Sequence, residues 1–387
     1  MYAKSRHVLI TGAGIGGLSA AIALRQRGAS VTVLEQADAI REVGAGLQIS
    51  PNGGAVLRAI GVWNDIASRG IAARAVVLKD YQRSGDVLRL DLAQLSKPDD
   101  YVLLHRADLI ETLLSHAQDI GVDIRLNQRV VSRLDGPGVV TEAGAHLTAD
   151  AVVAADGVRS VLRAGIVGPA APFFTGQVAW RAIVPNVTDQ ADHALVHMGP
   201  GRHLVSYPLR DRTCLNLVAV QERSAWQEEG WDHVDDPENL QAAFADFSED
   251  SRAMLNAVTD LRVWGLFRHP VAKAWHRNGV VLLGDAAHPT LPFLAQGANL
   301  AIEDAWVLAA ALDKVADPAK AFDAYQAARR SRVQRVVSAA NRNARAYHLR
   351  FGPVRSLAHL GLAVAGKLAP KAMLLPFRSI YDHDVTK

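Results

Sequence analysis

The chain has 387 residues, of which 49% are hydrophobic and 21% charged, a composition typical of a globular protein with two or three domains and a large core. Its formal net charge is only +3, and because no concentrated basic face stands out we expect no nucleic-acid partner. A single cysteine, Cys214, excludes an internal disulfide and no CxxC motif suggests a metal site, so we expect a cytoplasmic protein without a bound metal.

The first elements predict a βαβ unit. An apolar strand over His7–Thr11 is followed by a glycine-rich turn, a helical pattern over Ile15–Arg27 and a second strand over Ser30–Glu35. Strands that alternate with helices in this way belong to a parallel sheet with helices on its faces. No signal-peptide pattern precedes the first strand.

The turn after the first strand carries a dinucleotide fingerprint. Gly12, Gly14 and Gly17 satisfy GxGxxG, with Gly16 between the last two. The first permits a tight turn, the second lets the backbone approach a pyrophosphate, and the third allows close packing of helix on strand. Glu35 ends the second strand, where its carboxylate can accept hydrogen bonds from ribose hydroxyls. Glycine-rich turns also serve packing alone, but this context favours a nucleotide, either FAD or NAD.

Two later strands end in an acidic residue and a glycine, and an alternating region separates them. The strands are predicted over Ala151–Ala155, before Asp156 and Gly157, and over Val280–Leu283, before Gly284 and Asp285. The alternating segments lie near residues 178–184, 202–208 and 214–220. Such alternation predicts an antiparallel sheet with one wet face. The nucleotide-binding fold therefore has a β-rich part inserted between its own segments.

These motifs are candidates for holding an extended cofactor. Asp156 begins a strand-to-helix turn, and Asp285 is placed to hydrogen-bond a ribityl hydroxyl. The next loop consists of Ala295, Gln296, Gly297, Ala298 and Asn299. Its backbone N–H groups open a helix that begins near Asn299, and they could hold the electron-rich end of an isoalloxazine. Asp156 and Asn299 could each be a simple helix cap, but three motifs in this order favour FAD.

With these motifs in register, the chain resembles the aromatic flavoprotein monooxygenases of the para-hydroxybenzoate hydroxylase type. The likeness includes Gly44-Ala-Gly46 with Pro51-Asn52, His105-Arg106 before a helix, and the terminal Tyr381-Asp-His-Asp384, so it covers essentially the whole chain. Within the family the chain is most similar to the salicylate hydroxylase, 3-hydroxybenzoate 6-hydroxylase and 6-hydroxynicotinate 3-monooxygenase branch. The resemblance implies an α/β fold with a Rossmann-like FAD-binding domain, an inserted antiparallel β-sheet substrate domain and C-terminal helices.

The resemblance and the patterns together predict the domain organisation. We expect a discontinuous FAD-binding domain over residues 1–75, 100–175 and 278–345, a substrate domain over 76–99 and 176–277, and a C-terminal helical segment over 346–387. The apolar run Leu357–Leu375 is broken by polar residues, so we expect it to pack against the body of the protein without stable membrane association; a peripheral membrane contact is the weaker alternative. The basic run of Arg329, Arg330, Arg332 and Arg335 is expected to be a solvated helix face. Relatives are often dimers, so a homodimer is expected.

The resemblance also implies contacts with the cofactors. Arg106 would contact the ribityl–pyrophosphate part of FAD, Val130 would meet the adenine through its backbone, and Gln36 and Arg41 complete the expected set. The family keeps one permanent nucleotide site, for FAD, and binds NADH or NADPH transiently, which agrees with a single GxGxxG. Many relatives carry glycine where this chain has Ala295, and alanine is tolerated there unless the backbone needs a positive φ.

The inserted region offers residues for an aromatic substrate. His203 and Tyr207 share one face of a predicted strand, about 14 Å apart. The 3-hydroxybenzoate and 6-hydroxynicotinate hydroxylases have the same spacing on the face toward the ring. A lone strand histidine is more often structural, but the family match favours His203 as a general base near neutral pH, with Tyr207 bonding the substrate oxygen. Arg181 could pair with a substrate carboxylate or hold a domain interface.

Two further residues are expected beside the ring, Gln48 and Pro292, the latter close to the flavin. The 6-hydroxynicotinate enzymes carry a histidine near position 48, which argues against that substrate.

We therefore expect a monooxygenase that uses FAD, O₂ and either NADH or NADPH. By the resemblance, reduced flavin and O₂ form a C4a-hydroperoxide, which hydroxylates a phenolic or hydroxybenzoate-like ring made electron-rich by loss of its proton. Alternatives with the same fold act on a quinone precursor, an N-heteroaromatic ring or a polyketide, or are non-hydroxylating flavin oxidoreductases. A non-catalytic flavin-binding module and an NAD-dependent dehydrogenase are the alternatives from other classes.

Overall fold

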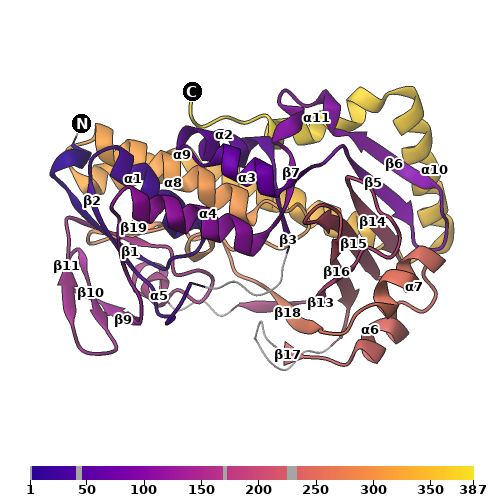
Figure 1. Ribbon diagram of the computed structural model, residues 1–387, viewed down its shortest axis with the longest axis horizontal. Helices are drawn as coiled ribbons and strands as arrows, with labels where there is room; N and C mark the ends of the chain where they lie inside the picture. Colours follow the sequence, from indigo (N-terminus) through magenta and orange to yellow (C-terminus); the bar gives the residue numbers. More distant parts are fainter. Residues whose placement is uncertain (1, 41–45, 169–171, 225–232) are drawn as a thin grey trace.

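The first sheet has six strands from distant parts of the chain (Figure 1), five of them parallel. The computed structural model describes residues 2–40, 46–168, 172–224 and 233–387. The strand order is β19-β20-β12-β1-β2-β8, and only the β19–β20 pair is antiparallel. The bounds are β1 His7–Thr11, β2 Ser30–Leu34, β8 Asp123–Arg125, β12 Ala151–Ala154, β19 His276–Arg277 and β20 Val280–Leu282. Strands β12 and β20 are apolar throughout, and β1 is apolar between His7 and Thr11, because both faces of the sheet are covered.

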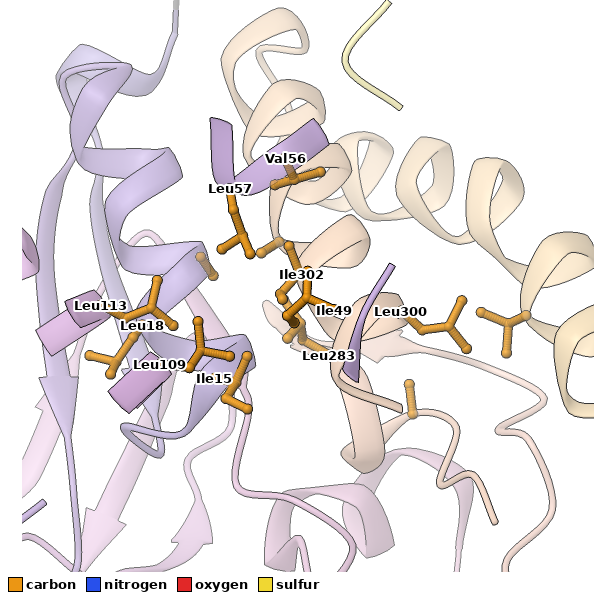
Figure 2. Packing of buried hydrophobic residues seen from close by; sticks show 14 of the residues in the cluster. Ile15, Leu18, Ile49, Val56, Leu57, Leu109, Leu113, Leu283, Leu300 and Ile302 are labelled. Atoms are coloured by element: carbon orange, nitrogen blue, oxygen red, sulfur yellow. The ribbon is translucent and has the colours of Figure 1, made fainter. Parts of the chain in front are cut away.

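The main core lies between this sheet and a group of helices. Helix α1 packs against both α4 and α8, α9 and α2 pack on α8, and α3 contacts α4. The bounds are α1 Ile15–Gln26, α2 Pro51–Ala59, α3 Trp63–Arg69, α4 Arg106–Asp119, α8 Gly297–Lys314 and α9 Pro318–Tyr347. Figure 2 shows Leu18 of α1 with Leu109 and Leu113 of α4 in this core, and Ile302 of α8 in the same cluster.

The second sheet has eight strands in the order β17-β18-β13-β16-β15-β14-β5-β6. The bounds are β5 Ala75–Asp80, β6 Asp86–Asp91, β13 Phe173–Pro185, β14 His193–Gly199, β15 Arg202–Leu209, β16 Cys214–Glu222, β17 His233–Val234 and β18 Arg262–Arg268. Its pairings are antiparallel, as the alternation predicts, except that β5 runs parallel to β14. A second core lies around Trp180, with the side chains of helices α6 Pro237–Ala243 and α7 Glu249–Asn256.

A small sheet of β3, β7 and β4 lies against the second sheet at the junction of the two larger ones. Its strands are β3 Gly46–Ile49, β4 Ile71–Ala72 and β7 Val102–His105. Gly46 permits the close approach of β3 to β15, because a Cβ there would lie only 2.6 Å from the Tyr207 ring. The Gly46 amide donates to Asn216 Oδ1 at 2.7 Å, which fixes β3 against β16. The remaining elements are β9 Val130–Arg133, β10 Gly138–Thr141, β11 His146–Thr148 and α5 Val161–Val167.

The C-terminal helices α10 Gly352–Leu368 and α11 Pro370–Tyr381 cross the strand β6 (Figure 1). One face of α10 packs on β6, and its buried His359 lies 3.1 Å from Asp80 at the end of β5. The other face is apolar and exposed; it comprises Phe351, Val354, Leu357, Leu360, Val364 and Leu368. The expectation that Leu357–Leu375 packs against the body is therefore wrong for this face. In the described part of the chain no single helix is long and apolar enough to cross a membrane; α10 and α11 pass that test only as a pair bent by 97°.

The basic run on α9 is not the solvated face that its composition predicts. Arg329 and Arg332 are 1% and 4% exposed, whereas Arg335 is exposed. Both buried guanidinium groups contact Glu303 at 2.5 Å, and Arg329 Nε also donates to Asp304 at 2.6 Å. The prediction fails because two consecutive acids on α8 face these arginines, and burying a charge requires such a partner.

Candidate functional site

A cavity of about 330 Å³ lies between the first sheet and one face of the second. The loops after β1, β12 and β20 supply one side, and strands β13, β15, β16 and β18 supply the other. Parallel strands place these loops together at their carboxyl ends, where open α/β sheets bind their ligands. The volume is within the range of small-molecule sites.

The glycine loop after β1 leaves room for a ligand at one position and is closely packed at another. No atom beyond its chain neighbours lies within 4 Å of a Cβ built on Gly14, which lines the cavity with Gly16. A Cβ on Gly17 would overlap the Gly12 carbonyl oxygen, so Gly17 is required for packing of α1 on β1. Gly12 has φ +95°, which its tight turn requires.

The acid after β2 supports this loop. Glu35 accepts hydrogen bonds from the backbone N–H groups of Ala13 at 2.8 Å and Ala37 at 3.0 Å. Each carboxylate oxygen retains further acceptor capacity toward a ribose. Gln36 is exposed next to it and Val130 is half-buried at the start of β9, and neither lines the cavity. Arg41, the remaining expected contact in this region, lies outside the described residues.

Asp156 lies on the loop after β12 but does not cap the helix that follows. Burial raises the pKa of its carboxyl to about 6, against the lowering effect of Ser160 and of the backbone at the start of α5. The N-cap of α5 is Ser160, whose hydroxyl accepts from the Arg163 amide, so the capping alternative for Asp156 is wrong. Gly157 and Val158 line the cavity in its place.

Asp285 and Arg106 lie on the cavity wall. The Asp285 carboxylate is open to the cavity but enclosed by protein around it, so burial raises its pKa, while His288 and Arg106 lower it. Arg106 is the first residue of α4. An acceptor carboxylate and a cation on one wall suit a ligand with both hydroxyl and phosphate groups.

The loop before α8 presents backbone to the cavity through Ala295, Gln296, Gly297 and Ala298. The helix begins at Gly297, two residues before the position predicted from the sequence. Asn299 does not line the cavity; its side chain accepts from the Ser50 amide at 3.0 Å and donates to the Gln48 carbonyl at 2.9 Å. It therefore ties the loop to β3. Ala295 has φ +51°, the condition under which alanine is strained.

The wall opposite these loops is one face of the second sheet. His203, Val205 and Tyr207 of β15 all line the cavity, as period-two alternation predicts. Arg181 pairs with Val218 across β13 and β16, and its guanidinium lies 4.8 Å from the Trp264 ring centre. Burial raises the pKa of the Tyr207 hydroxyl, so it remains a neutral hydrogen-bond donor. Trp264 is a cavity residue that the sequence analysis missed, since apolar strand residues carry no sign of a site.

Gln48 and Pro292 also line the cavity, near the strand face. Gln48 Oε1 accepts from the Tyr101 hydroxyl at 2.7 Å, which orients the amide and leaves its NH₂ group as a donor.

His203 is buried among aromatic rings. Phe293 and Tyr347 lie with ring centres 5.7 and 5.3 Å from the imidazole. Burial lowers its pKa well below the usual histidine range, and His348 lowers it further. His203 Nδ1 lies 2.6 Å from His348 Nε2, so Nε2 of His203 is the nitrogen left for a ligand. The sequence analysis missed His348, which is 145 residues away and at the end of α9 in a segment without a motif.

The open space at Gly14, the cavity-facing Asp285 and Arg106, and the exposed backbone before α8 together fit an extended FAD molecule. A family model described as FAD binding domain matches residues 5–340. The chain belongs to this FAD-binding family. The protein is an FAD-dependent aromatic-ring monooxygenase, with NADH or NADPH and O₂ as co-substrates.

Among curated relatives, the monooxygenase is 36% identical to the 3-hydroxybenzoate 6-hydroxylase of Polaromonas naphthalenivorans, covering 88% of each chain. It is 34% identical to the 3-amino-4-hydroxybenzoate 2-monooxygenase of Streptomyces cremeus, covering 91% of this chain and 90% of the other. Solved structures share its fold. A salicylate hydroxylase substrate complex matches with a TM-score of 0.83 at 20% identity, covering 99% of this chain and 97% of that one. Klebsiella pneumoniae HpxO with FAD and uric acid matches with a TM-score of 0.84 at 24% identity, with 97% coverage of both chains.

Proposed function

We propose that the substrate is a phenolic acid of the hydroxybenzoate type and that the strand face of the cavity binds it. The arrangement of His203, Tyr207 and Arg181 on this face carries the proposal. A buried neutral imidazole can accept a phenolic proton, a neutral tyrosine hydroxyl can donate to the substrate oxygen, and a guanidinium can pair with a carboxylate. The two curated relatives described above are named for hydroxybenzoate substrates.

The remaining site residues divide between holding FAD and shaping the pocket. The proposed FAD contacts remain those that the family resemblance implies: Gly12, Gly14, Gly16, Gly17, Glu35, Gln36, Arg41, Arg106, Val130, Asp156, Asp285 and the loop 295–299. Of these, Gly14, Gly16, Arg106, Asp285 and residues 295–298 line the cavity. When bound, FAD supplies the redox chemistry that transfers one oxygen atom from O₂. The protein's own part is to orient the ring, exclude water and accept the phenolic proton. Gln48 and Pro292 would contact the ring.

The test is a panel of phenolic and pyridine acids, scored for both stimulated NADH or NADPH oxidation and hydroxylated product. A phenolic acid should stimulate both at matching rates in the wild-type protein. His203→Ala should keep FAD, seen by its visible absorbance, and lose about 10²–10⁴-fold in turnover, the usual contribution of a general base. His197→Asn, a buried histidine outside the cavity, is the matched control. Unchanged turnover in His203→Ala would remove His203 from the mechanism.

We also propose the division into domains with the boundaries given by the sequence analysis, and cytoplasmic localisation. The separate FAD-side and substrate-side sheets support the first. Consumption of a nicotinamide nucleotide, which is an intracellular metabolite, supports the second.

A homodimer is a further proposal, with the exposed face of α10 as its interface. Apolar patches that run along a whole helix are rare on monomers and usually mark an interface. One solved structure with the same fold is described as a tetrameric form. Light scattering should give twice the chain mass for the wild type and a monomer for the double variant Leu357→Glu, Leu360→Glu. A monomeric wild type would contradict the proposal.

A further inference from the structure

A chain of hydrogen-bonded side chains leads from the cavity to the protein surface. It starts at His203 and continues from His203 Nδ1 to His348 Nε2 at 2.6 Å and from His348 Nδ1 to Glu222 Oε1 at 2.9 Å. Both histidines are buried, whereas the Glu222 side chain is 28% exposed. Arg350, which is mostly exposed, donates to Glu222 Oε2 through Nε at 2.9 Å and through a terminal nitrogen at 2.5 Å.

Glu222 fixes the tautomers of both imidazoles. Hydrogen bonds from Arg350 and His348 lower the pKa of the Glu222 carboxyl, against the effect of its partial burial, so it is an acceptor without a proton. His348 must therefore carry its proton on Nδ1, which leaves Nε2 as an acceptor. His203 must then donate from Nδ1, and its Nε2 carries the lone pair. The Gln177 amide, at 3.4 Å from His348 Nδ1, is too distant to compete with the carboxylate.

The surroundings of His203 explain why this imidazole cannot by itself keep a proton that it takes from the substrate. Phe293 and Tyr347 pack on its ring, and His348 is the only titratable side chain of the described residues that hydrogen-bonds it. Burial also lowers the pKa of His348, although Glu222 raises it in part. A positive charge left on either ring would be poorly solvated. The negative carboxylate at the far end can take up the proton without leaving a charge inside.

We propose that His203, His348 and Glu222 form a proton relay that moves the phenolic proton of the substrate from the cavity to solvent. The relay rests on the proposed function. The phenol O–H gives its proton to His203 Nε2, the His203 Nδ1 proton passes to His348 Nε2, and the His348 Nδ1 proton passes to Glu222 Oε1. The substrate becomes a phenolate, both imidazoles end neutral in the opposite tautomers, and Glu222 becomes a neutral acid that releases its proton to water. His348 and Glu222 are positioning residues, since only His203 lines the cavity.

The tautomers can be measured without substrate. In the FAD-loaded protein labelled with ¹⁵N-histidine, nitrogen shifts should show His203 protonated at Nδ1 with a bare Nε2, and His348 protonated at Nδ1. Glu222→Gln should weaken this preference, whereas Glu222→Asp, which keeps the carboxylate, should restore it. The nitrogen signals that disappear in His348→Phe are those of His348, so this variant assigns the spectrum. A His203 proton on Nε2 in the wild type would overturn the relay.

The second measurement is proton release, followed with a pH-indicator dye after rapid mixing with 3-hydroxybenzoate. Wild type and His197→Asn should release one proton on binding, whereas His348→Phe and Glu222→Gln should do so at least tenfold more slowly, with substrate affinity changed less than threefold. Because Glu222 is partly exposed at the surface, Glu222→Gln is informative even if His348→Phe folds poorly. Release at the wild-type rate in both variants overturns the relay. A wild type that responds to no acid of the panel defeats the proposed function instead, and the tautomer measurement still decides the arrangement.

Discussion

Ala295 concentrates backbone strain beside the cavity. Its φ of +51° costs a residue with a Cβ roughly 1 kcal/mol, which glycine would avoid. Glycine has more freedom to lose on folding, which offsets about half of the gain or more. We expect Ala295→Gly to raise the free energy of unfolding by up to about 0.5 kcal/mol and Ala295→Val to lower it by more than that, because a β-branched residue tolerates this region poorly. Urea unfolding measures both; equal losses in the two variants would contradict the argument.

At the residue scale, the cavity residues on strand β15 could be predicted from the sequence. The residues that hydrogen-bond them from other parts of the chain could not. His203 and Tyr207 follow from period-two alternation, which is local and needs no knowledge of the fold. His348 and Glu222 reach His203 only because the end of α9 meets the edge of the second sheet, and no local pattern contains that information. Asn299 shows the same limit, because its side chain is used to hold β3.

At the element scale, helices α8 and α9 are joined by buried charge. Arg332 holds Glu303 on α8 and also donates to the Ser379 and Ile380 carbonyls at the end of α11. Most of the predicted element boundaries agree with the structure to within about two residues, because they depend on glycines, caps and periodicity. Strand β13 is an exception, since it begins at Phe173 and the alternating segment was predicted from near residue 178. The partners of a charged helix face depend on tertiary packing, so the sequence could not show that Arg329 and Arg332 are buried.

We expect Arg332→Met to lower the free energy of unfolding by about 3 kcal/mol, because Glu303 loses a buried partner although Arg329 and Asn52 still contact it. Hydrogen exchange near residues 379–380 should also rise. Adding Glu303→Gln should recover part of the loss, since the unpaired charge is then removed. Arg335→Met, on the exposed side of the same helix, is the control and should change little. A loss of equal size in Arg335→Met would show that helix propensity is responsible.

For the whole molecule, the sequence indicated which segments form each sheet but not how the sheets are completed. Four of the five parallel strands follow from the βαβ pattern and the two acidic–glycine strand ends, whereas β8 was not predicted. The parallel pairing of β5 with β14 was missed, because strand order depends on which edges meet after folding. The outward apolar face of α10 was missed for a related reason: an apolar stripe predicts burial without saying whether the cover comes from the same chain.

Several histidines buried in the neutral form make stability depend on pH. Burial lowers the pKa of His197 to about 4, and the pKa values of His203 and His348 are also lowered. In the unfolded chain histidine titrates near 6.5, so between these values the unfolded state binds more protons and stability falls as pH falls. His197 alone should cost about 2 kcal/mol between pH 7 and pH 5. Urea unfolding at both pH values should show a smaller loss for His197→Asn than for wild type, while His146→Asn, at an exposed site, should match wild type. An unchanged loss in His197→Asn would mean that this histidine is already protonated in the folded state.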